Sequence, residues 1–253
     1  VVMSGVERMK NYGVEFNTLT ALNDYSVRFP VEIYRFLKKI GSRFHQYIPV
    51  VERKRISGSY PLEIIPPCYT GEAEITKWSV DPGMYGEFLK RVFDEWVKRD
   101  VGTYFVQLFD AVLANYAGVV PGLCIYAGAC ANPVLEYNGD VYSCDHFVFP
   151  EYRLGNIMER SLSELVVSRK NMEFGFAKRQ SLPYECRSCR YTDICNGGCL
   201  RNRILRASEQ GKNKNYLCSG LKEFYAHTEK RMRFMLKEIQ NGRAPAGIMD
   251  AEI

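Results

Sequence analysis

The 253-residue sequence lacks the features that mark membrane, nucleic-acid-binding and secreted proteins. No apolar run approaches the roughly 20 residues of a membrane-spanning helix, so no membrane association is predicted. The charge is nearly balanced, with 34 Lys and Arg against 29 Asp and Glu, and a nucleic-acid surface is not indicated. There is no recognisable signal peptide, internal repeat or low-complexity tract. We therefore expect an ordinary folded protein.

Cysteine is almost absent from the first half of the chain and dense in the second. Only Cys68 precedes residue 124, and we assign it no role. The other eight form a loose first group, a tight Cys-x2-Cys-x5-Cys-x3-Cys run and one later residue. They are Cys124, Cys130, Cys144, Cys186, Cys189, Cys195, Cys199 and Cys218.

Three chemistries use cysteine at this density. A disulfide framework belongs to small secreted chains, whereas this chain, at 46% hydrophobic residues, can bury a core without one. Two structural zinc sites remain an alternative, although zinc ribbons usually repeat one CxxC spacing and these spacings are uneven. We prefer iron–sulfur clusters, because a cubane needs four thiolates that converge from irregular loops. Many thiols without secretion also suit a reducing cytoplasm.

The cysteine pattern, with Gly139 five positions before Cys144, resembles the SPASM domain. This is the auxiliary-cluster domain of radical S-adenosylmethionine enzymes that modify peptides and proteins. The added Cys130 and three further segments resemble one family within it, the anaerobic sulfatase-maturating enzymes. These segments are Cys144-Asp145-His146-Phe147-Val148, Leu154-Gly155-Asn156-Ile157 and Gly197-Gly198-Cys199.

The resemblance implies two auxiliary [4Fe-4S] clusters, whose ligand sets do not follow from spacing alone. It implies that one cluster is held by Cys124, Cys130, Cys144 and Cys199. It implies that the other is held by Cys186, Cys189, Cys195 and Cys218. Cys199 then crosses from the tight run to the first group.

Hydrophobic periodicity before residue 118 predicts alternating helices and strands. Helices are expected at 1–12, 30–40 and 82–99, and strands at 14–22, 44–51 and 103–109, the last leading into a short helix through residue 116. This order favours parallel strands with right-handed crossovers. Because three strands cannot close a barrel, the predicted fold class is α/β, the second half of a partial (β/α) barrel.

The resemblance also indicates what is missing from such a half barrel. The family's barrel begins with strands that carry a CxxxCxxC triplet, which binds the cluster that reduces S-adenosylmethionine. No such triplet precedes Cys124, and the chain starts with Val. We therefore expect the C-terminal portion of a longer enzyme, inert on its own.

The remaining stretches complete three expected domains, at 1–117, 118–220 and 221–253. Residues 52–80 are expected to be a long, ordered connection. Asn138-Gly139 predicts a tight hairpin turn that delivers Cys144 at a strand end. Helical spacing predicts an amphipathic C-terminal helix over 221–239, and residues after about 241 are expected to be a frayed tail.

Two residues are candidates for roles other than cluster ligation. A carboxylate beside a metal-bound thiolate, partly shielded from water, can be tuned for proton abstraction, which makes Asp145 the candidate catalytic residue. From position alone, an Asp that caps the next turn is the favoured interpretation, and the resemblance favours catalysis. The resemblance also places Val51, at a predicted strand end, along the adenine of S-adenosylmethionine.

The implied function is radical oxidation of a Cys or Ser of a sulfatase to Cα-formylglycine. The implied cofactors are the two auxiliary clusters, with S-adenosylmethionine and a third [4Fe-4S] cluster in the complete enzyme. The implied partners are an unfolded or nascent sulfatase polypeptide and a reductant such as flavodoxin or ferredoxin. Two rivals remain: another SPASM enzyme that crosslinks a ribosomal peptide, and a non-catalytic metal-binding module.

Overall fold

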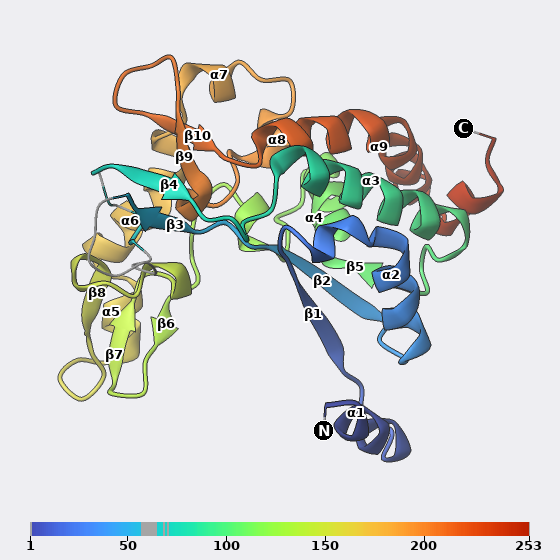
Figure 1. Ribbon diagram of the computed structural model, residues 1–253, viewed down its shortest axis with the longest axis horizontal. Coiled ribbons are helices and arrows are strands. Elements are labelled where there is room, and N and C mark those ends of the chain that lie inside the picture. The colour runs from blue at the N-terminus through green and yellow to red at the C-terminus, as the bar shows by residue number, and fades with distance from the viewer. Residues whose placement is uncertain (1, 57–64, 68, 70, 253) are drawn as a thin grey trace. The chain divides into compact units, whose positions relative to one another are not determined.

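The computed structural model describes residues 2–56, 65–67, 69 and 71–252 (Figure 1). It divides the chain into two compact units. The first combines Val1–Glu52, Thr76–Val119 and Leu217–Ile253, and the second combines Arg53–Ile75 and Val120–Tyr216. Each unit is built from separated stretches, whereas the sequence suggested three consecutive domains.

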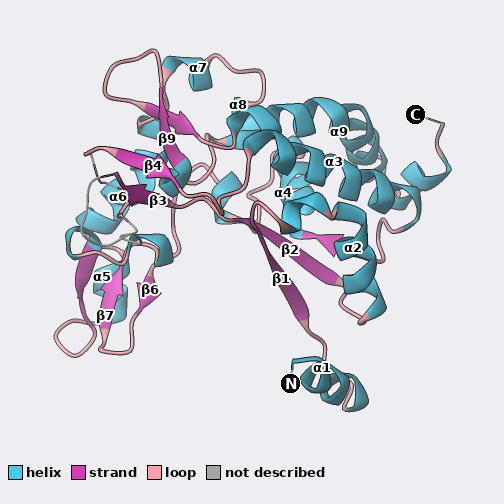
Figure 2. Ribbon diagram, in the orientation of Figure 1, coloured by secondary structure: helices cyan, strands magenta, loops and turns pink. Residues whose placement is uncertain are grey.

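A three-stranded parallel sheet lies in the first unit. Strand β1 (Asn17–Leu22) pairs with β2 (Phe44–Pro49), and β2 pairs with β5 (Phe105–Val106). Figure 2 shows β1 and β2 running side by side. The α/β class with parallel strands, predicted from the alternation of elements, is confirmed.

The third strand is shorter than the predicted 103–109, because helix α4 (Gln107–Tyr116) begins where the strand was expected to continue. The helix buries Leu108, Phe109, Ala111 and Val112 on one side. The Phe109 ring stacks on Phe224, with ring centroids 5.6 Å apart. Long-range aromatic packing therefore outweighs the local strand propensity of this stretch.

Four longer helices complete the first unit: α1 (Val2–Asn11), α2 (Pro30–Lys39), α3 (Pro82–Arg99) and α9 (Cys218–Gln240). The start of α3 is as predicted, since the Asp81 side chain accepts a hydrogen bond from the Met84 backbone N–H at 2.9 Å. Among the described residues, no helix is both long and apolar enough to cross a membrane.

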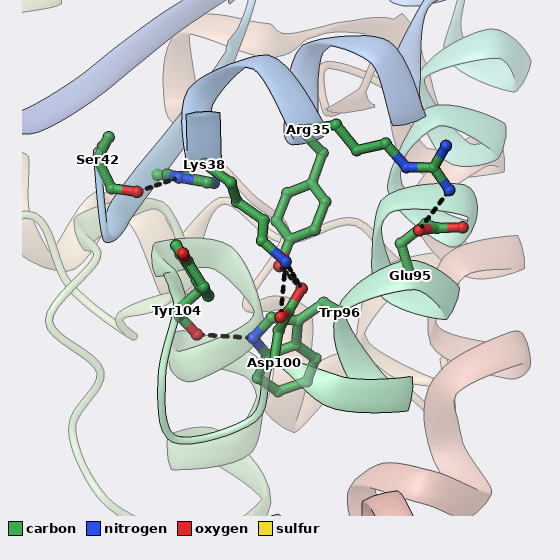
Figure 3. Close-up of polar contacts among 9 residues, drawn as sticks. Arg35, Lys38, Ser42, Glu95, Trp96, Asp100 and Tyr104 are labelled. Atoms are coloured by element: carbon green, nitrogen blue, oxygen red, sulfur yellow. Dashed lines mark hydrogen bonds and ion pairs between the residues drawn. The ribbon is translucent and has the colours of Figure 1, made fainter. Parts of the chain in front are cut away.

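A buried ion pair joins α2 to the end of α3 (Figure 3). Asp100 is only 5% exposed, and its carboxylate accepts hydrogen bonds from Lys38 Nζ at 2.6 Å and from the Tyr34 hydroxyl at 2.7 Å. Burial, followed by the hydrogen bond to Asp100, raises the pKa of Tyr34. The carboxylate is therefore buried with both a cation and a neutral donor, as a buried charge requires.

The C-terminal residues after α9 are not frayed, contrary to the prediction. Residues Pro245–Asp250 form the 3-10 helix η6, and Ile248 is only 5% exposed. An ion pair between Arg243 and Glu238 precedes this turn. The buried isoleucine anchors a stretch whose composition gave little sign of a core contact.

The second unit consists of short elements. Its strands form three antiparallel groups: β3 (Arg53–Arg55) with β4 (Ala73–Ile75), β6 (Val134–Leu135) with β7 (Asp140–Tyr142) and β8 (Arg153–Asn156), and β9 (Arg203–Arg206) with β10 (Asn213–Asn215). Its helices are α5 (Leu162–Val166), α6 (Arg169–Gln180), α7 (Tyr184–Arg187) and α8 (Thr192–Cys195). Most of the chain between these elements is turn or 3-10 helix.

The stretch predicted as a connection over 52–80 carries the hairpin β3–β4. Residues 57–64, 68 and 70 lie outside the described residues, so the expected order of the connection there, and the expectation that Cys68 has no role, stay predictions. The hairpin at Asn138-Gly139 is confirmed, although of these two residues only Gly139 takes a positive φ. Arg153 fixes this hairpin through an ion pair to Asp140 at 2.6 Å.

Helices α3 and α9 approach closely at a pair of glycines, and Figure 1 shows the two helices side by side. A Cβ atom on Gly86 would lie 2.5 Å from the carbonyl oxygen of Gly220. Glycine is required here because the backbones leave no room for a side chain.

We expect Gly86→Ala to lower the free energy of unfolding by about 1–3 kcal/mol, because the added methyl group forces α3 and α9 apart. The measurement is the midpoint of thermal unfolding followed by circular dichroism. Gly5→Ala is the matched control, since a Cβ there meets nothing within 4 Å. Equal midpoints for the two variants would contradict the assigned close approach.

Candidate functional site

Four cysteines of the second unit lie near one another. Cys124 begins a 3-10 helix, Cys130 donates its backbone N–H to Gly175 at 3.2 Å, and Cys144 follows strand β7. Burial raises the pKa of Cys130, and the nearby thiols of Cys199 and Cys124 raise it further. The structure therefore gathers the set that the resemblance implied for the first cluster.

The pKa values of Cys144 and Cys199 indicate that these two thiols also lie near other cysteines of the set. Burial raises the pKa of Cys144, with a smaller contribution from Cys199, and burial raises that of Cys199, with a contribution from Cys124. Each of the four cysteines thus feels the charge of at least one other. Cluster ligation by these residues stays a prediction.

Three cysteines of the implied second set follow one another along two short helices. Cys186 lies in α7, the Cys189 backbone N–H donates to its carbonyl at 3.2 Å, and Cys195 ends α8. The implied fourth member, Cys218, belongs to the first unit, where it is the first residue of α9. The eight cysteines in positions 124–218 are all free thiols in the structure, so the disulfide alternative is not borne out.

The separation of the thiols bears on which inorganic group they suit. In a tetrahedral zinc site with Zn–S bonds of about 2.3 Å, the sulfurs stand roughly 3.8 Å apart. Within the described residues, one group of three potential ligand atoms lies within 4.8 Å of one another, formed by Cys144, Asp145 and His146. No three of the described thiols converge that closely. Cysteine thiolates are the donors that both zinc and iron–sulfur clusters use, so the choice between the two groups stays open at this point.

Asp145 directly follows Cys144, a member of the first cysteine set. Its Oδ1 accepts a hydrogen bond from the Cys144 thiol at 3.1 Å and lies 3.2 Å from His146 Nδ1. Its side chain is 70% exposed, which is more open than the sheltered carboxylate that was expected. Partial burial raises its pKa, but the Cys144 thiol and His146 together bring the pKa below its usual value. The carboxylate is therefore ionised at neutral pH, and its role as a proton acceptor stays a prediction.

The turn between Cys195 and Cys199 has an unusual backbone. Asn196, Gly197 and Gly198 take φ values of +48°, +71° and +64° in succession. A Cβ atom on Gly198 would collide with the Asn215 side-chain amide. Two consecutive glycines thus serve both the left-handed turn and the close approach of β10.

Val51 lies just beyond the C-terminal end of β2 and is 5% exposed. The Val80 backbone N–H donates to the carbonyl of Val50 at 2.9 Å, which fixes the chain at this point. The position at a strand end is as predicted, and its contact with adenine stays a prediction.

A hollow in the second unit is a separate feature. It encloses about 680 Å³ and is lined by residues that include Arg53, Tyr69, Glu72 and Arg206. No cysteine of either set lines it, and neither does Asp145. We therefore place the chemistry at the cysteine groups and not in this hollow.

Comparisons with known proteins agree with this site. A family model described as the SPASM iron–sulfur cluster-binding domain matches residues 127–190. The serine-type anaerobic sulfatase-maturating enzyme of Bacteroides thetaiotaomicron is 43% identical over 251 residues, which are 99% of this chain and 60% of that protein. The chain is a homologue of the anaerobic sulfatase-maturating enzymes.

Other sulfatase-maturating enzymes extend the likeness. The cysteine-type enzyme of Clostridium novyi is 30% identical over 241 residues, or 94% of this chain and 60% of that protein. The solved structure of native anSMEcpe with bound AdoMet and Cp18Cys peptide matches with a TM-score of 0.75 at 29% identity, over 94% of this chain and 62% of that one. The chain spans about 60% of the length of these curated relatives. The resemblance to anaerobic sulfatase-maturating enzymes, predicted from the cysteine pattern, is confirmed.

Two residues near the cysteines were not found from the sequence. Lys178 is fully buried and Arg203 is 8% exposed, in a unit where most long cationic side chains reach solvent. The sequence carries no hydrophobic pattern that marks the lysine, because the residues that α6 buries are Asn171, Gly175 and Lys178. A cation at such a position is rarely buried without a reason.

We expect Gly198→Ala to destabilise the reconstituted protein through both strain and collision with Asn215. The matched control is Gly211→Ala, where φ is +76° but a Cβ meets nothing within 4 Å. The control should cost about 1 kcal/mol from backbone strain, and Gly198→Ala a further ~1–3 kcal/mol from overpacking. Thermal unfolding midpoints measure the difference, and equal midpoints would mean that the turn adapts.

Proposed function

We propose that the chain contributes to radical oxidation of a sulfatase Cys or Ser to Cα-formylglycine. The observation that carries the proposal is the 43% identity, over 251 residues, to a serine-type sulfatase-maturating enzyme. The exposed Asp145 carboxylate beside Cys144 supports it, because the oxidation needs a proton acceptor at the substrate.

The proposed cluster ligands are the two sets of four cysteines named above. The thiols of the first set lie close enough to interact electrostatically, and four cysteine thiolates are the donor set of an iron–sulfur cluster. When bound, auxiliary clusters supply one-electron acceptance, and S-adenosylmethionine with its own cluster supplies the hydrogen-abstracting radical. That radical-generating cluster uses a CxxxCxxC triplet, a motif that the 253 residues do not contain.

In the proposed mechanism Asp145 takes the thiol or hydroxyl proton of the substrate residue. Its low pKa keeps the carboxylate ionised, and its 70% exposure leaves the acceptor oxygen open to an incoming peptide. His146, at 3.2 Å, is placed to take up the proton in turn. Loss of one hydrogen atom, one proton and one electron from the CH2–OH group gives the aldehyde, and the thioaldehyde formed from cysteine requires hydrolysis.

Val51 is proposed to lie along the adenine of S-adenosylmethionine, since it stands at the sheet edge where chemistry collects in barrels of this kind. The proposed partners are an unfolded sulfatase polypeptide and a reductant of the flavodoxin or ferredoxin type. The free thiols suit a reducing compartment such as the cytoplasm.

Metal and acid-labile sulfide content tests the cluster assignment. After anaerobic reconstitution we expect about eight iron and eight sulfide per chain, with broad absorbance near roughly 400 nm. Cys130→Ser should lose about half of both, because it removes a ligand of one cluster only. Cys68→Ser is the control and should keep both. About two zinc with no sulfide in the unmodified chain would overturn the redox assignment.

Substitution of Asp145 tests the catalytic assignment. The protein is this chain joined to the CxxxCxxC-bearing segment of a relative, and the substrates are peptides with a sulfatase Cys or Ser. We expect Asp145→Asn to slow aldehyde formation by about 10²–10⁴-fold, because the proton acceptor is lost. Mass spectrometry of the peptide measures the product, and iron content confirms that the clusters remain.

The control for this experiment is Asp250→Asn, an exposed aspartate at the end of η6. It should oxidise the peptide at the unmodified rate. If Asp145→Asn is as active as this control, Asp145 is not the proton acceptor. If the unmodified protein forms no aldehyde from either peptide, a different peptide-modifying reaction replaces the maturase proposal.

A further inference from the structure

Lys178 is a fully buried cation in the cysteine-rich unit. Its side chain is 0% exposed, and its ammonium donates to the carbonyls of Cys124 at 2.6 Å and Ile125 at 3.0 Å. These hydrogen bonds hold the turn that presents the first cysteine. Burial lowers the pKa of Lys178, and the nearby thiols of Cys130, Cys199 and Cys124 oppose that fall.

Arg203 is a second buried cation, and it is hydrogen-bonded to the backbone of the first. Its guanidinium donates to the Lys178 carbonyl at 2.7 Å, to the Gly197 carbonyl at 3.1 Å and to the Asn196 carbonyl at 3.0 Å. It therefore ties the end of α6 to the left-handed turn before Cys199. The two cations and the backbone between them connect the Cys124 turn to the Cys199 turn.

Neither cation has a carboxylate partner among the described residues. Among the described residues, the hydrogen bonds of the Lys178 ammonium go to backbone carbonyls, and those of the Arg203 guanidinium go to carbonyls and the Ser181 hydroxyl. Carbonyl dipoles satisfy the donors but do not cancel a full charge in a medium of low dielectric constant. The groups that these cations face are cysteine thiols, which become negatively charged thiolates when they ligate a cluster.

We propose that Lys178 is a positioning residue whose fixed positive charge sets the reduction potential of the cluster held by Cys124, Cys130, Cys144 and Cys199. This rests on the cluster assignment of the proposed function. Reduction adds one negative charge to the cluster, and a buried cation stabilises the more negative state most. Lys178 thereby makes the cluster a better acceptor of the single electron that leaves the oxidised substrate.

The same charge should act on one cluster and not on the other. The cysteines that share Lys178's electrostatic environment all belong to the first set, whereas Arg203 also faces Cys186 and Cys195 of the second. Substitution of Lys178 is therefore selective, and the second cluster serves as an internal reference. Arg203 supports three turns at once and is a poorer choice for substitution.

The experiment is a redox titration of the full chain after anaerobic reconstitution, followed by electron paramagnetic resonance. Lys178→Met removes the charge and the donor in an unbranched side chain, and Lys178→Gln removes the charge but keeps a donor. We expect both to favour the oxidised state of one cluster at least tenfold, a fall in midpoint potential of about 59 mV for a one-electron couple. Lys170→Met, at an exposed lysine of the same helix, should leave both potentials unchanged.

The outcomes separate this proposal from the cluster assignment. An unmodified chain that binds no iron and sulfide overturns the cluster assignment and, with it, this proposal. Unchanged potentials in a Lys178 variant with full iron content overturn the electrostatic role alone. If Lys178→Met loses the cluster, Lys178→Gln decides: a lowered potential supports the role of charge, and an unmodified potential or a lost cluster assigns Lys178 to loop support only.

Discussion

The guanidinium of Arg203 is the interaction that organises the cysteine-rich unit. It donates to the carbonyls of Lys178, Gly197 and Asn196 and to the hydroxyl of Ser181, so it holds a helix end and a left-handed turn together. The strands of this unit are two to four residues long and cannot supply much of that order. Here, hydrogen bonds from buried cations to backbone carbonyls hold the segments together, as long ladders of backbone hydrogen bonds do in ordinary sheets.

The first unit is stabilised in a different way. Its core is an aromatic and aliphatic cluster in which Phe109 stacks on Phe224, and its helices meet at Gly86 and Gly220. Its one deeply buried carboxylate, Asp100, has both a cation and a hydroxyl as partners. The charges of this ion pair are thus compensated within the first unit, whereas in the cysteine-rich unit two buried cations face thiols.

This contrast explains where function resides. A folded core neutralises its buried charges, because an uncompensated charge lowers stability. Lys178 and Arg203 break that rule beside a cysteine group, and such departures are characteristic of sites where an ion or cluster supplies the opposite charge. Asp145 adds an exposed, ionised carboxylate next to Cys144. On the proposed assignment, cluster ligation and proton transfer fall on the consecutive residues Cys144 and Asp145.

Features that depend on a few neighbouring residues could be predicted from the sequence. The Asp81 cap, the Gly139 turn and the parallel order of β1, β2 and β5 belong to this class, because capping, turn geometry and hydrophobic period are local. The cysteine spacing likewise indicated the family. The early end of β5 and the burial of Ile248 were missed, since both depend on packing partners distant in the chain.

The grouping of the thiols into two sets could be predicted only in part from the sequence. Spacing gave eight ligands but no assignment to sets, and only the tertiary structure brings Cys199 beside Cys124 and Cys130 across a sequence distance that no local rule spans. Lys178 shows the same limit: the residues that α6 buries are Asn171, Gly175 and Lys178, and such polar or small residues give no hydrophobic pattern from which the burial could be predicted. Residue chemistry is fixed along the chain, whereas the electrostatic environment of each group is set by long-range contacts that form only on folding.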